Sequence, residues 1–172
     1  PEQTSDLLVM SFDGKGIVMR PDSLRECTRK KVKQSKKLKT RLSQGEKKDR
    51  KRMAQVATVY TVHPHIRTAD SIMNASEDEK VVSFRPPIRS KRVWASVERD
   101  PELVIKEGFE EALQRDPEQK RQWVVLVDGL PYQIKLIKKV MKALKVKATI
   151  VMDFIHVLEY LWKAACSSRL RC

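Results

Sequence analysis

The segment "DLLVMSFDG" (Asp6 to Gly14) is a short apolar run that ends on a carboxylate followed by a glycine. The same arrangement recurs in "RQWVVLVDG" (Arg121 to Gly129), where an apolar run again stops at Asp-Gly. Short apolar runs before a turn-like dipeptide are typical of strands. We therefore expect two strands that end at Asp13 and Asp128. The second run is uniformly apolar, which is typical of a central strand covered on both faces.

The rest of the chain alternates between strand-like and helix-like patterns. Short runs rich in apolar and β-branched residues predict further strands in residues 53–64, 92–98 and 148–153. Apolar residues at helical spacing predict helices in residues 22–45, 99–118, 131–145 and 154–165. Residues 15–20 either resume the first strand or begin the next, and residues 66–91 are polar and indicate a long loop. This order predicts an α/β protein with a sheet layer rather than a helical bundle.

The composition limits the classes of protein to consider. With 172 residues, 41% of them hydrophobic, the chain can bury one ordinary core, and a second full domain would be crowded. It has no stretch of about 18 uncharged apolar residues, so we expect no contact with a membrane. The three cysteines lack the spacing of a zinc site and indicate no disulfide framework, which fits a reducing cytosol. The tryptophans lie in apolar patterns, so we expect core positions for Trp94, Trp123 and Trp162.

The net charge of +14 is large for this length and favours polyanionic partners. Residues 25–52 alone hold 14 Lys or Arg against three acids. Most charge runs are simply solvated, but the acids here are too few to balance the run, so we expect contact with nucleic acid. The expected DNA-binding residues are Lys30, Lys31, Lys33, Lys36, Lys37, Lys39, Arg41, Lys47, Lys48, Arg50, Lys51 and Arg52.

Asp13 and Asp128 are the first candidate site residues, because strand ends are where an α/β sheet presents polar groups to a ligand. Two converging carboxylates repel each other unless a cation lies between them, and Mg²⁺ prefers carboxylate oxygens. Two such ions about 3.5–4 Å apart can activate a water or a 3′-hydroxyl in phosphodiester cleavage. The alternative for either Asp-Gly pair is an ordinary turn.

A second candidate group lies in "VMDFIHVLEYLW". On a helix, Asp153 and His156 fall roughly on one face, with Glu159 three residues beyond the histidine. A metal or acid-base role is one interpretation. The other is that Asp153 caps the helix and His156 is a hydrogen-bonded structural histidine.

Several segments, taken in order, resemble the ISKra family of bacterial insertion-sequence transposases. They are "SFDGKGIVMRPDSLREC", "LSQGEKKDRKRMAQVATVY", "KRVWASVE", "WVVLVDG" followed by Gln133, and "VMDFIHVLEYLWKAA". The resemblance covers nearly the whole chain up to Ala165. It implies the DDE class of transposases and an RNase H-like mixed sheet flanked by helices, with an inserted basic helix and a long loop. It also implies Mg²⁺- or Mn²⁺-dependent cleavage of transposon ends and strand transfer into target DNA.

The resemblance also assigns roles to individual residues. Asp13 would be the first catalytic acid and Asp128 the second, and both would be metal ligands. Asp153 and His156 would match an Asp-x-x-His motif that follows the fifth strand in the family. The family's third acid, a glutamate, is expected beyond an extra helical region, and Glu159 is the candidate substitute here.

The resemblance divides the chain into two parts. Residues 1–165 would be a partial RNase H-like catalytic core, with a basic insertion at 22–52 and a flexible loop at 66–91. Residues 166–172, "CSSRLRC" from Cys166, would be a divergent C-terminal tail. The sequence thus indicates a partial or truncated copy.

Three functions follow from these observations. The first is a metal-dependent DNA transposase that acts on double-stranded DNA in the bacterial cytoplasm, at the nucleoid, with a homo-oligomer as a further assembly. The second is a catalytically inactive DNA-binding remnant that interferes with the full-length enzyme. The third is an RNA-binding protein that uses residues 25–52, since charge alone does not distinguish RNA from DNA.

Overall fold

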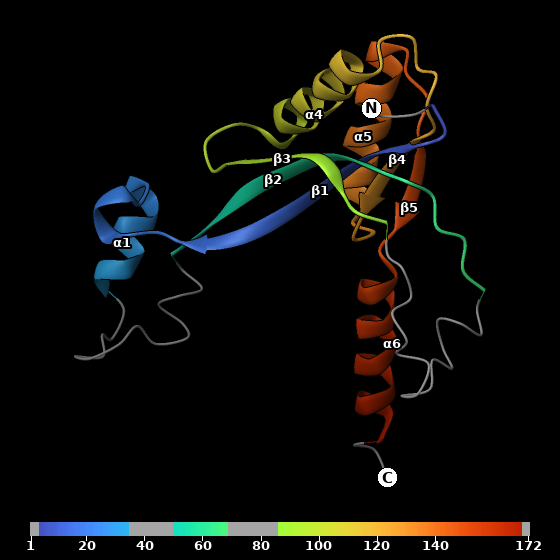
Figure 1. The fold of residues 1–172 in the computed structure, drawn as a ribbon. Helices are drawn as coiled ribbons and strands as arrows, with labels where there is room; N and C mark the ends of the chain where they lie inside the picture. Colours follow the sequence, from blue (N-terminus) through green and yellow to red (C-terminus); the bar gives the residue numbers. More distant parts are fainter. Residues whose placement is uncertain (1–3, 35–49, 69–85, 170–172) are drawn as a thin grey trace.

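In the computed structural model of the protein, residues 4–34, 50–68 and 86–169 are described. Their centre is a five-stranded sheet of order β3-β2-β1-β4-β5 (Figure 1). The strands are β1 (Leu7–Val18), β2 (Lys51–Val62), β3 (Arg89–Ser96), β4 (Trp123–Val127) and β5 (Thr149–Met152). β2 is antiparallel to both of its neighbours, whereas β1, β4 and β5 run parallel. The predicted α/β class with a mixed sheet flanked by helices is confirmed.

β1 does not end at Asp13, so that prediction was wrong and the first strand resumes after the Asp-Gly pair. The strand continues to Val18 and pairs with β2 along all 12 of its residues. Gly14 keeps an extended backbone there, because its antiparallel partner Gln55 continues the ladder. The apolar run stops because the strand leaves the core: β4 pairs only with Leu8–Ser11.

Beyond that point β1 and β2 form a two-stranded ribbon. Residues 15–18 and 51–54 pair with each other and, in the described part of the chain, with no third strand. At the tip of the ribbon lie the short helix η1 (Pro21–Ser23) and α1 (Glu26–Gln34), on the left of Figure 1. The helix predicted over 22–45 is therefore correct for residues 26–34, and residues 35–45 lie outside the described ranges.

Two helices, α4 (Pro101–Arg115) and α5 (Pro131–Leu144), pack together over one face of the sheet. Each has proline in its first turn, which suits a helix start. The buried side chains between helices and sheet include Phe12 and Phe109, whose rings stack at a centroid distance of 6.0 Å. The rest of this core comes mainly from alternate residues of the strands and one stripe of each helix: Leu8, Met10, Ala57, Val59, Val104, Ile105, Ala112, Trp123, Val125, Val127, Ile137 and Val140.

A buried carboxylate, Asp116, fixes the passage from α4 to β4. Its oxygens accept hydrogen bonds from Trp123 Nε1 at 2.8 Å and from the backbone amides of Lys120 and Arg121, both at 3.0 Å. Burial by itself raises the pKa of Asp116, but these donors and the Arg121 guanidinium outweigh it and hold the pKa below its usual range. The negative charge is therefore part of the folded structure.

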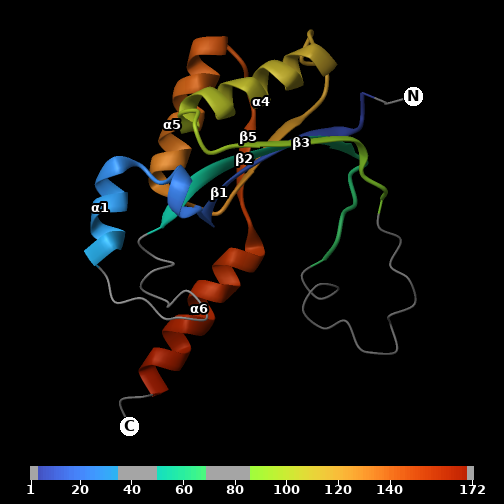
Figure 2. The same ribbon diagram turned by 90° about the vertical axis from the view of Figure 1, so that its left-hand side faces the viewer.

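The second face of the sheet is less well covered than the sequence indicates. In β4, Trp123, Val125 and Val127 are buried, while Val124 and Leu126 on the other face are only half-buried. The prediction of a strand covered on both faces was wrong. The apolar helix that follows β5 does not lie across this face (Figure 2).

That helix, α6 (Phe154–Arg169), extends away from the sheet on the side opposite α4. Its large apolar side chains are exposed, and Trp162 is 74% accessible. The core position predicted for Trp162 was therefore wrong, whereas Trp123 is buried and Trp94 packs partly against the core. The helix also continues past Ala165 to Arg169, so no structural break marks the predicted tail at residue 166.

The predicted loop 66–91 ends earlier than expected, because β3 begins at Arg89. Residues 69–85 of that loop lie outside the described ranges. Among the helices that the structure describes, none has both the length and the apolar character needed to cross a membrane.

Candidate functional site

The strand register brings the predicted acids to one level of the sheet. Ser11 of β1 is paired with Leu126 of β4, and Asp13 and Asp128 each lie two residues further along these parallel strands. Val127 is likewise paired with Met152 of β5, and Asp128 and Asp153 each follow by one residue. The Asp153 amide donates to the Val127 carbonyl at 2.8 Å, which extends this pairing. The three aspartates therefore form a row across neighbouring strands, named here the acidic row.

The acidic row borders a shallow hollow of about 130 Å³. Asp13, Asp128, Asp153 and His156 all line it, together with Ser11 and the β4 residues beside them. Partner residues of parallel strands point to the same face, so Asp13 and Asp128 lie on the face opposite the helix-covered core. The convergence predicted for Asp13 and Asp128 is therefore present, and Asp153 and His156 join them.

The three carboxylates differ in whether they accept hydrogen bonds from backbone amides. Asp13 is exposed and has no hydrogen-bond partner among the described residues. One oxygen of Asp128 accepts from the Leu130 amide at 3.0 Å, and one oxygen of Asp153 accepts from the Ile155 amide at 2.9 Å. Asp153 therefore does cap α6, as one of the two interpretations predicted. For both residues the second carboxylate oxygen makes no hydrogen bond within the described chain.

The turn interpretation of Asp-Gly is correct at Asp128 and wrong at Asp13. Gly129 has a φ of 94°, a conformation that a side chain would strain, and the chain turns there from β4 into α5. A turn after Asp128 does not remove the carboxylate from the site, because that side chain still lines the hollow. At Asp13 the same dipeptide lies inside a strand.

Glu159, the candidate third acid, does not line this hollow. It is exposed on α6, and one carboxylate oxygen lies 3.9 Å from Lys163 Nζ. The side chains that approach Asp13 and Asp128 from the α6 side are instead Asp153 and His156.

The donor set of the hollow suits a hard divalent cation. Carboxylate oxygens from one or two residues, completed by waters and substrate oxygens, are the usual environment of Mg²⁺ in proteins. Asp13 offers both oxygens, and Asp128 and Asp153 offer one each. In the residues that the structure describes, no group of three His, Cys, Asp or Glu side chains is arranged closely enough to hold a metal ion by itself.

The predicted DNA-binding residues are only partly described. Lys30 is exposed on α1 and lies 3.4 Å from Glu26, Lys51 is exposed on the ribbon, and Arg50 and Arg52 are more buried. Lys31 and Lys33 belong to α1. The remaining residues of that prediction lie outside the described ranges: Lys36, Lys37, Lys39, Arg41, Lys47 and Lys48.

Two residues near these sites were missed as site residues from the sequence. Gln133, in the first turn of α5, is 5% exposed, and its Oε1 is buried without a hydrogen-bond partner. It lines a second hollow of about 200 Å³ that also includes Asp128. Arg25 lines a separate cavity at the ribbon. A polar residue on the apolar stripe of α5 was the available signal for Gln133; Arg25 had none beyond its place in the basic run.

Comparison of the chain with protein-family models, with curated proteins and with solved structures finds no match.

Proposed function

We propose that the protein is the catalytic core of a DDE-class DNA transposase that resembles the ISKra family. The observation that carries the proposal is the acidic row. Asp13, Asp128 and Asp153 lie at one level of the sheet, just beyond the residues that pair β1 with β4 and β4 with β5. Asp128 and Asp153 each accept one local backbone hydrogen bond, but these bonds do not require Asp13 beside them, and none of the three acids forms an ion pair with a described residue. A site for a cation explains why like charges gather at this edge.

An RNase H-like fold belongs to the same proposal. Its support is the mixed sheet of order β3-β2-β1-β4-β5, in which β2 alone runs against the other strands. Helices α4 and α5 cover one face, which leaves the other face of β1 and β4 beside the acidic row accessible to a large substrate.

In this proposal Asp13 and Asp128 hold Mg²⁺ or Mn²⁺, and Asp153 and His156 complete the edge of the site. The metal would supply Lewis-acid activation of a water or 3′-hydroxyl and stabilise the leaving oxygen of a phosphodiester. Asp13 has the most freedom to bind, because no hydrogen bond restrains its carboxylate within the described chain. Asp128 is oriented by the Leu130 amide, which holds one oxygen and leaves the other for a ligand.

The partner in this proposal is double-stranded DNA at the bacterial nucleoid. The support is the charge of +14, concentrated in the segment that joins β1 to β2 and therefore attached to the strand that carries Asp13.

The first experiment is a Mn²⁺ titration of the full chain followed by calorimetry. We expect saturable binding to the wild type, and loss of more than about tenfold in affinity for Asp13→Asn and Asp128→Asn, because each removes one of few ligands. Asp22→Asn is the matched control, since it removes an exposed carboxylate that pairs with Arg20 at the ribbon tip.

A second readout is nicking of supercoiled plasmid DNA in the presence of Mn²⁺. We expect activity in the wild type and none in the Asp13→Asn or Asp128→Asn variants, because two-metal sites act as a unit. Equal metal affinity in the wild type and both variants would refute the site at the acidic row.

The position of Glu159 favours a second candidate, a DNA-binding protein without catalysis. Its carboxylate lies with Lys163 rather than in the hollow, so the third acid expected in the family has no counterpart among the residues that line it. Salt-sensitive DNA binding without metal binding or nicking would select this second function.

A further inference from the structure

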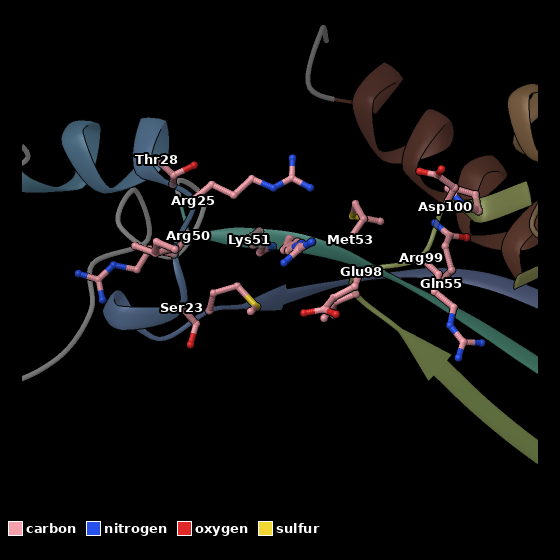
Figure 3. A pocket seen from close by; sticks show the side chains of 15 residues that line it. Ser23, Arg25, Thr28, Arg50, Lys51, Met53, Gln55, Glu98, Arg99 and Asp100 are labelled. Atoms are coloured by element: carbon pink, nitrogen blue, oxygen red, sulfur yellow. The ribbon is translucent and has the colours of Figure 1, made fainter. Parts of the chain in front are cut away.

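A cavity of about 370 Å³ lies where the ribbon, α1 and the start of α4 meet (Figure 3). Five cationic and two acidic residues line it. In Figure 3, Arg25 extends from the α1 side toward the centre of the cavity and Lys51 lies on the ribbon, whereas Glu98 and Asp100 occupy the opposite side. This space is named here the basic cavity.

Two glycines of β1 help to create the room for it. Gly14 and Gly16 face the ribbon residues whose side chains border the cavity: a Cβ at Gly14 would lie 3.2 Å from Met53, and a Cβ at Gly16 would lie 3.3 Å from Lys51. Without side chains on β1, the Met53 and Lys51 side chains lie across the bare strand. Met53 and Lys51, which line the basic cavity, therefore lie where Gly14 and Gly16 leave room for their side chains.

Three of its cations have no acidic partner among the described residues. In the described chain no carboxylate pairs with Arg25, Lys51 or Arg52, and all three line the cavity. Arg99, by contrast, is paired with Glu107 outside it. The cavity therefore carries a positive charge that is available to an anion.

Arg52 adds a second, independent observation. Its Nε is buried and has no hydrogen-bond acceptor among the described residues. A buried N–H without an acceptor costs about 1–3 kcal/mol, so such groups in native proteins commonly have a partner that is bound from outside. Gln133 Oε1 is likewise buried and has no hydrogen-bond donor among the described residues. Gln133 lines the hollow next to the cavity.

A second hollow lies between the basic cavity and the acidic row. The basic cavity and the 200 Å³ hollow share Met53, Gln55 and Pro101 as lining residues, and that hollow shares Asp128 with the acidic hollow. The 200 Å³ hollow therefore borders both the basic cavity and Asp128. The same hollow is lined by the exposed ring of Tyr132, a surface on which a base can stack.

We propose that the basic cavity binds a phosphate group. Guanidinium groups match phosphate oxygens with paired N–H donors, and an ammonium adds a point charge, so Arg25, Arg52 and Lys51 form a suitable donor set. The space is large enough and open enough to accept the phosphate of a nucleic-acid strand or a free phosphate. The inference rests on the proposed function only where the phosphate belongs to a nucleic-acid strand. The positive charge and the buried Arg52 Nε call for an anion whether the phosphate is part of a strand or free.

The test compares Arg25→Gln/Lys51→Gln with the wild-type full chain, by fluorescence polarisation with a labelled DNA duplex over a series of NaCl concentrations. Both side chains are exposed and unpaired in the described chain, so the variant keeps the fold. We expect the Kd to rise about tenfold and the slope of log K against log salt to fall by about 0.9 for each phosphate that the variant no longer neutralises. Lys120→Gln is the matched control, because Lys120 does not line the cavity and is paired with Glu118, and it changes the Kd less than about twofold.

A second arm identifies the source of the phosphate. Inorganic phosphate at matched ionic strength is tested for a rise in Tm of the wild type that the double variant lacks. A rise in Tm that the double variant lacks shows that the cavity also binds free phosphate. If the double variant loses only affinity for DNA, the cavity binds the phosphate of a nucleic-acid strand. If neither ligand responds to the double variant, or if Lys120→Gln acts as strongly, the inference is overturned. Because no variant of this test touches Asp13 or Asp128, failure of metal binding leaves its result intact.

Discussion

Asp116 shows how a single charged side chain in this protein can stabilise the fold without belonging to the site. Its carboxylate is 8% exposed and accepts three hydrogen bonds at 2.8–3.0 Å from a tryptophan ring and two backbone amides. The sequence offered no sign of this role, since "QRDPEQKRQW" has the composition of an ordinary polar turn. The partners of Asp116 become neighbours only when Trp123 enters β4.

We predict that Asp116→Asn lowers the free energy of unfolding at pH 7 by about 2 kcal/mol, because hydrogen bonds to a charged group are removed and one donor faces an amide NH₂. The folded-state pKa is lowered, so this contribution is complete above the ordinary Asp pKa and is lost as the pH falls. Urea unfolding should therefore show a difference between wild type and variant that shrinks from about pH 5 downward.

The control for this prediction is Asp100→Asn. Asp100 is exposed at the N-cap position of α4, but its side chain makes no capping hydrogen bond, contrary to the helix-start role that the sequence "RDPE" suggests. We expect a change within about 0.5 kcal/mol at every pH. A pH-independent difference for Asp116→Asn would mean that the charge of Asp116 does not stabilise the fold.

The sequence identified individual site residues but not their arrangement in space. The Asp-Gly repeats pointed to Asp13 and Asp128, and the helix pattern pointed to Asp153 and His156. Their common level depends on how β1, β4 and β5 are paired, and a shift of one residue would turn Asp128 to the other face. No local pattern in the sequence contains that register.

At the scale of the elements, α6 departs most from the sequence pattern. Its apolar residues at helical spacing predicted a helix, correctly, and a buried one, wrongly. The helical spacing of apolar residues shows which side chains lie on one face of the helix. Whether that face is buried depends on a partner surface that packs against it. β1 is the opposite case: its apolar run stops at Phe12, yet the strand continues because β2 supplies its hydrogen bonds.

For α6 we predict that Trp162→Gln changes the free energy of unfolding by less than about 0.5 kcal/mol, since the indole is 74% exposed. The same substitution at Trp123, which is 2% exposed and donates to Asp116, should cost more than about 3 kcal/mol. Thermal or urea unfolding of both variants makes the comparison. A destabilisation at Trp162 as large as that at Trp123 would show that α6 packs against another surface in solution.

At the scale of the whole molecule, stability is distributed unevenly along the sheet. The strand segments below α4 and α5 are buried and paired on both sides, whereas the ribbon residues 15–18 and 51–54 have one paired neighbour each. Local opening requires little free energy where it brings few buried apolar side chains into water. The overall class, one α/β core with a basic appendage, was visible in the sequence because it depends on composition and alternation rather than on pairing.

We predict that backbone amides in the ribbon exchange with deuterium faster than those of Leu8–Ser11 and Trp123–Val127, by a factor of at least about 100, because the core amides open only with larger units of structure. Native-state hydrogen exchange followed by mass spectrometry of peptides from each segment makes the measurement. Equal protection of the ribbon and of the core strands would contradict the prediction.

The ribbon also has a mechanical consequence. Asp13 is where β1 passes from the five-stranded sheet into the two-stranded arm, so one unbroken length of backbone joins the acidic row to the basic cavity. An isolated two-stranded ribbon is only marginally stable, so the arm beyond Gly14 has less support than the part of β1 under the helices. We therefore expect a displacement of α1 at the tip of the ribbon to be transmitted along β1 toward Asp13.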